Sequence, residues 1–172
     1  MSFQVLTGAY LEEMRQILGH EFVLVDEVTL KNYGHDETED IHFQPEVVVK
    51  PCNTQEVSQI LKLCNKYQIP VTPRGGGTGL SGGALPVYGG VVLSTERLNK
   101  IIEIDEKNLQ ALVEPGVITL VFQETVKEKG LFYFGCHSVG FLYRFLNSQA
   151  FRRSLCLIPE SVWVIVMLHL LP

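Results

Sequence analysis

The chain has little charge for its length. Asp, Glu, Lys and Arg make up 19% of its 172 residues, against roughly a quarter in an ordinary soluble domain. The formal net charge is −5, and no stretch of the sequence concentrates lysine and arginine. Because binding to a nucleic-acid backbone relies on clustered positive charge, the composition excludes nucleic acid as the main partner.

Three further signals are missing. The N-terminus has no basic segment followed by an apolar stretch and a small-residue cleavage site, so no secretory signal is predicted. The apolar run at the C-terminal end is shorter than the roughly 20 residues that a membrane-spanning helix needs. No two cysteines have the C-x-x-C spacing, so we predict no metal site and free thiols at Cys52, Cys64, Cys136 and Cys156. We therefore expect a cytoplasmic protein without a transmembrane segment.

Hydrophobic periodicity and turn signals predict a compact α+β domain. The predicted helices cover residues 7–19, a segment that begins after Asn53, and residues 118–130. The predicted strands cover residues 46–50, 69–73, 91–95, 101–104 and 109–113. Asn53 or Thr54 is the predicted cap, and Glu56 can complete a capping box from Asn53. Two prolines limit the strand at 69–73 to a sheet edge or a strand end. The apolar stripe predicted for the helix after Asn53 is Val57, Ile60, Leu61 and Cys64, and the face predicted for the helix at 118–130 is Ile118, Val121, Phe122, Thr125 and Val126.

Two segments carry weaker patterns. Acids crowd together with His35 and His42 in residues 31–44, and a solvated loop is favoured there over a metal site. After residue 130 the charge almost disappears, since Glu160 is the only acid in residues 131–172. The apolar run that ends this tail predicts a buried strand or an aggregation-prone end.

A glycine-rich run, PRGGGTGLSGGA at residues 73–84, is the strongest functional signal. A P-loop is excluded because the run lacks the lysine that this motif requires. Gly77 to Gly82 formally match the Rossmann G-x-G-x-x-G pattern, with acids at a plausible distance in Glu103 and Asp105. That pattern requires a helix that begins within it, whereas the following residues contain Pro86 and show no helical periodicity.

A third interpretation needs no helix. Successive backbone N–H groups of a glycine-rich loop can form a concave nest for an anion, and the length of this loop suits a diphosphate. The hydroxyls of Thr78 and Ser81 would add donors, and Arg74 would add positive charge. A flexible linker is disfavoured because Pro73 and Pro86 flank the run, with predicted strands on either side.

Residues 33–133, with the motifs PRGGGTGLSGG and VEPGV, resemble the N-terminal region of FAD-linked 2-hydroxy-acid oxidoreductases. The similarity is to the flavin subunit of glycolate oxidase and to D-lactate dehydrogenases, which have a vanillyl-alcohol-oxidase-type FAD-binding domain. The resemblance implies FAD, held without a covalent bond because Thr78 stands where some members carry a histidine. The implied cofactor-binding residues are Pro73, Arg74, Gly75, Gly76, Gly77, Thr78, Gly79, Leu80, Ser81, Gly82, Gly83, Glu114, Pro115, Gly116 and Val117.

The resemblance also implies an activity, the oxidation of a 2-hydroxy acid to a 2-oxo acid by hydride transfer to flavin, and an iron–sulfur partner subunit. We divide the chain into a leader helix and polar loop (1–44), the first half of the FAD-binding domain (45–133) and a divergent apolar tail (134–172). Truncation with a shifted reading frame would explain the tail, and a paralogue with its own tail stays open. On this interpretation the chain alone is inactive, and no residue is assigned a catalytic role. The alternative is a non-enzymatic module that binds FAD or another diphosphate, or a partner.

Overall fold

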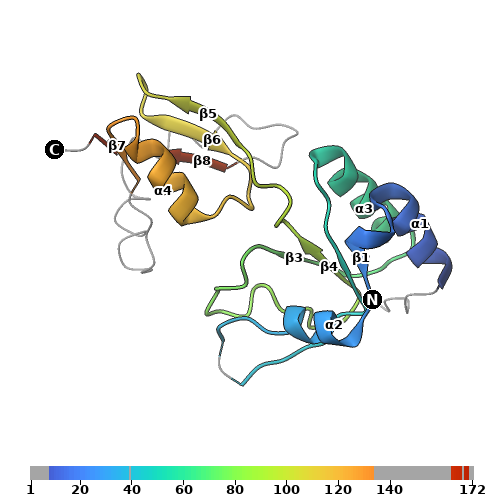
Figure 1. Cartoon of the computed structure of the whole chain (residues 1–172). Coiled ribbons are helices and arrows are strands. Elements are labelled where there is room, and N and C mark those ends of the chain that lie inside the picture. The colour runs from blue at the N-terminus through green and yellow to red at the C-terminus, as the bar shows by residue number, and fades with distance from the viewer. Residues whose placement is uncertain (1–7, 39, 134–163, 168, 171–172) are drawn as a thin grey trace. The chain divides into compact units, whose positions relative to one another are not determined.

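The computed structural model describes residues 8–38, 40–133, 164–167 and 169–170 (Figure 1). The chain divides into two compact units, Met1–Asn99 and Lys100–Pro172. Among the helices of the described residues, none has the length and apolar content of a membrane span. The sequence-based division at residues 44 and 133 stays a prediction.

The first unit is built on a four-stranded sheet in the order β1-β2-β4-β3. Its strands are β1 (Val23–Leu24), β2 (Val47–Val49), β3 (Val71–Arg74) and β4 (Val91–Ser94). β2 pairs with β4, and β4 with β3, in parallel, whereas β1 joins β2 antiparallel. The position of β3 at the edge confirms the prediction from its proline, because Pro73 cannot donate a ladder hydrogen bond.

Helices cover both faces of this sheet (Figure 1). α1 (Gly8–Leu18) and α3 (Thr54–Lys66) pack on one face against Val47 and Val49, and α2 (Glu27–Tyr33) packs on the other face against Val48. A short 3-10 helix, η1 (His20–Phe22), precedes β1. Parallel sheets are normally buried on both sides, which is why β2 and β4 consist almost entirely of valine and leucine.

The start of α3 confirms the predicted capping box. Asn53 Oδ1 accepts a hydrogen bond from the Glu56 N–H at 2.8 Å, and Glu56 Oε2 accepts one from the Cys52 N–H at 2.8 Å. One member of the predicted stripe is wrong, since Leu61 is 45% exposed and Leu63 is buried in its place. Hydrophobicity alone could not separate two leucines that lie two positions apart.

The second unit holds an antiparallel sheet in the order β5-β6-β8, made of β5 (Ile101–Asp105), β6 (Gln110–Val113) and β8 (Val164–Met167). β8 confirms that part of the apolar end of the chain forms a strand, one of the two alternatives predicted for it. α4 (Thr119–Lys127) packs Phe122 and Val126 into the core of this unit, while Val121, which the predicted helical face included, is 50% exposed. β7 (Leu131–Phe132) pairs with β9 (His169–Leu170).

The segment at residues 31–44 differs in part from its prediction. α2 extends to Tyr33, so the beginning of the predicted loop is helical. Asp26 caps this helix by accepting a hydrogen bond from the Thr29 N–H at 2.9 Å. Most later side chains of the segment are exposed, as a solvated loop requires, but Asp36 is only 7% exposed. Burial of this carboxylate places part of the segment against another element of the unit.

Candidate functional site

The glycine run forms a loop that leaves the end of β3 and returns to β4, without a helix. A Rossmann site requires a helix that begins between Gly77 and Gly82, so the structure excludes that alternative. The two acids that matched its spacing, Glu103 and Asp105, lie on β5 in the other unit. The loop therefore connects two strands directly, and the polar groups that it chiefly offers to a ligand are those of its backbone.

The backbone of the loop leaves a run of donors unused. Among the described residues, no acceptor pairs with the amide N–H groups of residues 75–81. Gly77 and Gly82 have φ angles of +72° and +68°, in the left-handed region that favours glycine. A Cβ added at Gly75 or Gly83 would meet no atom within 4 Å, so the space beside these residues is open. Consecutive unpaired N–H groups beside open space make a nest for an anion.

Arg74 lies beneath this loop as the last residue of β3. Its side chain is 9% exposed, and Nη1 donates a hydrogen bond to the His35 carbonyl oxygen at 2.7 Å. Its guanidinium lies 5.3 Å from the centre of the Tyr33 ring. A Cβ on Gly77 would collide with this guanidinium, so the loop and Arg74 fit together only because residue 77 is glycine. Arg74 thus brings a buried positive charge under the loop.

A polar network fixes the Tyr33 ring. The Tyr33 hydroxyl donates to Glu96 Oε1, and Lys50 Nζ donates to Glu96 Oε2 at 2.8 Å. Burial, and then the hydrogen bond with Glu96, raise the pKa of Tyr33. Burial by itself raises the pKa of Glu96, but hydrogen bonds from Lys50 and Tyr33 outweigh it and leave that pKa below its ordinary value. Tyr33 therefore stays a neutral donor, and its ring stays under Arg74.

Sequence reasoning assigned no role to residues 34–38, which lie directly against the glycine loop. The Glu37 N–H donates to the Gly79 carbonyl oxygen at 3.1 Å, and the Gly82 N–H donates to Thr38 Oγ1 at 2.9 Å. The amide of Gly82 is consequently occupied, unlike the amides before it. Thr78 and Ser81, the predicted hydroxyl donors, are both exposed. No sequence signal links the two segments, because their contact spans 44 positions of the chain.

The predicted turn at Glu114–Pro115–Gly116–Val117 belongs to the second unit. The Val117 N–H donates to the Glu114 carbonyl oxygen at 3.2 Å and closes the turn. Glu114 is 5% exposed, and its Oε2 accepts a hydrogen bond from the Lys100 N–H at 2.7 Å. The carboxylate thus anchors the turn to the start of β5. The predicted cofactor-binding residues are divided between the two units, with the glycine loop in the first and this turn in the second.

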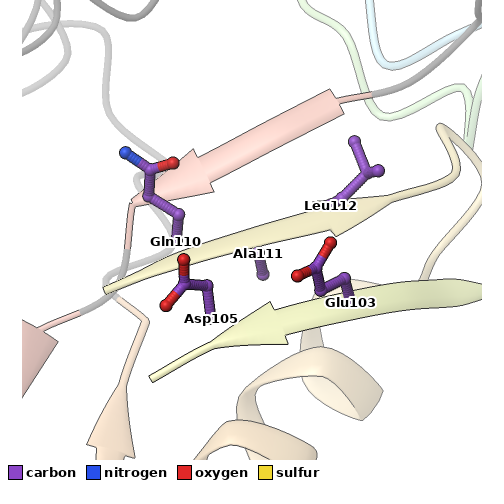
Figure 2. A pocket seen from close by; sticks show the side chains of 5 residues that line it. All are labelled: Glu103, Asp105, Gln110, Ala111 and Leu112. Atoms are coloured by element: carbon purple, nitrogen blue, oxygen red, sulfur yellow. The ribbon is translucent and has the colours of Figure 1, made fainter. Parts of the chain in front are cut away.

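A pocket lies on β5 and β6, and no residue of the glycine loop lines it (Figure 2). Its lining residues are Glu103, Asp105, Gln110, Ala111 and Leu112. Asp105 is engaged locally, since it accepts hydrogen bonds from the Asn108 side chain and N–H at 2.6 and 2.9 Å, which lower its pKa. The pocket presents carboxylates and no cation, so it does not suit a diphosphate. Among the residues that the structure describes, no three His, Cys, Asp or Glu side chains are placed to hold a metal ion.

Comparison with known proteins agrees with the geometry of the loop. A family model described as FAD binding domain matches residues 45–140. Glycolate oxidase subunit GlcD of Bacillus subtilis is 42% identical over 129 residues, which cover 75% of this chain and 27% of that protein. A D-lactate dehydrogenase of Anaerostipes hadrus is 34% identical over 132 residues, which cover 76% of this chain and 28% of that protein.

Comparison with solved structures gives the same result. The structure of p-cresol methylhydroxylase with substrate bound matches with a TM-score of 0.67 and 30% identity, covering 74% of this chain and 26% of that one. This match confirms the vanillyl-alcohol-oxidase-type fold. The chain spans about a quarter of the length of the relatives it matches. The chain belongs to the FAD binding domain family, and its matching region is similar to part of a glycolate oxidase subunit and of a D-lactate dehydrogenase.

Proposed function

We propose that the glycine loop holds the diphosphate of FAD through its backbone. The observation that carries this proposal is the run of N–H groups at residues 75–81, which have no acceptor among the described residues, in a loop with open space beside Gly75 and Gly83. Such a run of unpaired donors can satisfy the oxygens of a diphosphate without a helix terminus. The proposed cofactor-binding set is Pro73, Arg74, Gly75, Gly76, Gly77, Thr78, Gly79, Leu80, Ser81, Gly82, Gly83, Glu114, Pro115, Gly116 and Val117.

The residues of the loop fit this cofactor. The buried Arg74 guanidinium supplies positive charge beneath the anion, and the glycines leave no Cβ between the backbone and the phosphate oxygens. The loop contains no histidine or cysteine, so it offers no side chain of those types for a covalent bond to the flavin. We therefore propose that FAD is bound without a covalent link.

The activity that we propose for the intact enzyme is oxidation of a 2-hydroxy acid of the glycolate or D-lactate class to the 2-oxo acid. FAD supplies the redox chemistry when it is bound, by accepting a hydride equivalent, and the protein supplies its position. Support comes from the names of the relatives, a glycolate oxidase subunit and D-lactate dehydrogenases. Because the chain spans only about a quarter of those proteins, we propose that it does not turn over alone. An iron–sulfur partner subunit also stays a prediction.

Flavin binding and turnover can be measured on the purified chain. The chain is mixed with FAD, freed of excess flavin, and examined by absorbance and by dye reduction with glycolate or D-lactate. We expect a flavin spectrum, release of all flavin on denaturation, and no dye reduction. A chain that retains no FAD would contradict the proposed site. Flavin that stays with the denatured protein would contradict non-covalent binding, and robust dye reduction would contradict inactivity.

A non-enzymatic module is the second candidate. It is favoured by three apolar side chains exposed at the start of α4, since Ile118, Leu120 and Val121 are 67%, 62% and 50% exposed. Such a module would use the loop for any nucleoside diphosphate and α4 for a protein contact. Binding of ADP as tightly as FAD, without dye reduction, would favour this candidate. A strong preference for FAD would favour the flavoenzyme.

A further inference from the structure

Residues 34–38, which we call the supporting segment, hold the glycine loop through a set of polar contacts. Three hydrogen bonds join the two, from Arg74 to the His35 carbonyl, from the Glu37 N–H to the Gly79 carbonyl, and from the Gly82 N–H to Thr38 Oγ1. The FAD binding domain match begins at residue 45, so it does not include this segment. The segment is therefore part of the site's structure, although nothing in the family match assigns it.

Asp36 is the buried side chain at the centre of this contact. Its Oδ1 accepts a hydrogen bond from the Thr38 N–H at 2.9 Å, whereas Oδ2 is buried without a partner among the described residues. Oδ2 faces the loop, because it lies 3.8 Å from the position of a Cβ added at Gly79. The carboxylate is 7% exposed, although its neighbours His35 and Glu37 are exposed.

An unpartnered buried carboxylate oxygen is costly, and among the described residues no hydrogen bond reaches Asp36 Oδ2. Arg74 attracts the charge of Asp36 but donates its Nη1 hydrogen bond to His35 instead. Hydrogen bonds from the side chain and N–H of Thr38, with the nearby charge of Arg74, hold the pKa of Asp36 below its ordinary value. At neutral pH the free oxygen is therefore an acceptor that lacks a donor.

We propose that Asp36 Oδ2 accepts a hydrogen bond from a sugar hydroxyl that adjoins the diphosphate held by the glycine loop. This inference rests on the proposed function, because it requires a diphosphate in the loop. The diphosphate itself cannot be the partner, since it carries only acceptors and repels a carboxylate. The groups that flank the diphosphate of FAD, ribose on one side and ribitol on the other, both carry hydroxyl donors. Arg74 beneath the loop offsets the repulsion between Asp36 and the phosphates.

The test compares Asp36→Asn with Asp40→Asn in the full chain. In D36N the amide oxygen can still accept from the Thr38 N–H, but a donor replaces the acceptor that faces the loop. Asp40 is exposed and has a φ of +57°, a conformation that asparagine tolerates, so its substitution removes the same charge from a nearby position. FAD affinity is measured by flavin fluorescence, and affinities for ADP and inorganic pyrophosphate by calorimetry.

We expect D36N to weaken FAD binding at least about tenfold, in line with the loss of a charged hydrogen bond, while D40N stays within about twofold. Pyrophosphate, which has no sugar hydroxyl, should bind D36N at least as well as the unmodified chain. If ADP loses affinity as well, the ribose of the adenosine half is the partner. If ADP keeps its affinity while FAD loses it, the partner is the ribitol.

Four outcomes would overturn the inference. If D36N binds FAD with unchanged affinity, Asp36 makes no hydrogen bond with a sugar hydroxyl, and the proposed function is unaffected. An equal loss of pyrophosphate binding would show that Asp36 acts through the shape of the loop. Without ligand, a D36N chain clearly less stable to urea than D40N would reveal a protein donor for Oδ2. Failure of the unmodified chain to bind FAD would overturn the proposed function, and this inference with it.

Discussion

The fit between Gly77 and Arg74 predicts that Gly77→Ala destabilises the first unit. Gly77 has a φ of +72°, and an alanine there costs about 1–2 kcal/mol of backbone strain. The added Cβ would also displace the Arg74 guanidinium and break its hydrogen bond to the His35 carbonyl oxygen. Hydrogen bonds to charged groups contribute about 1.5–3 kcal/mol. Since the arginine side chain can relax in part, we expect a total loss of about 2–4 kcal/mol, a large share of an ordinary domain's stability.

The assay is urea unfolding of the purified chain, followed by far-UV circular dichroism. With a slope of about 2 kcal/mol per molar urea, the expected loss lowers the midpoint by about 1–2 M. Gly75→Ala is the matched control, because a Cβ there meets no atom within 4 Å and the φ of Gly75 is not in the left-handed region. We expect this control to keep or slightly raise the stability. A Gly77→Ala midpoint equal to that of Gly75→Ala would refute the role assigned to Arg74.

Three further predictions concern α3 and the residues just before it. Asn53→Ala removes the side-chain oxygen that accepts a hydrogen bond from the Glu56 N–H, so we expect urea unfolding to show a loss of about 1 kcal/mol in stability. Asn53→Asp keeps an acceptor at this position and should retain the stability of the unmodified chain. Equal stability of the unmodified chain and both variants would contradict the role of Asn53 as a cap. Burial raises the pKa of the Cys64 thiol from 9.0 to about 11. The unfolded chain therefore loses the thiol proton first, and the stability contributed by Cys64 should fall as the pH rises from 9 to 11. In the native chain at pH 8, mass spectrometry should find iodoacetamide on the half-exposed Cys52 and none on Cys64; rapid labelling of Cys64 would refute its burial.

Sequence patterns were sufficient where the cause of a structure is local. The cap of α3 depends on Asn53 and Glu56, three positions apart, and the valine run of β2 indicates a strand buried on both faces. Pro70 and Pro73 limited the segment at 69–73 to a sheet edge or a strand end, because a proline has no N–H to donate to a neighbouring strand. The exposed Leu61 and Val121 were wrongly placed in cores, because the side that a helix buries is set by what packs against it.

The sequence by itself determined the cofactor class of this protein. A run of glycines lets a ligand approach the backbone N–H groups closely. The absence of a lysine argued against a P-loop, and the absence of a following helix argued against a Rossmann motif. The tertiary structure decided what lies beneath that backbone. It buried Arg74 under the loop, placed Tyr33 against it, and left one oxygen of Asp36 without a partner among the described residues. These contacts join segments about 40 residues apart, and only the packing of the sheet and its helices brings such segments together.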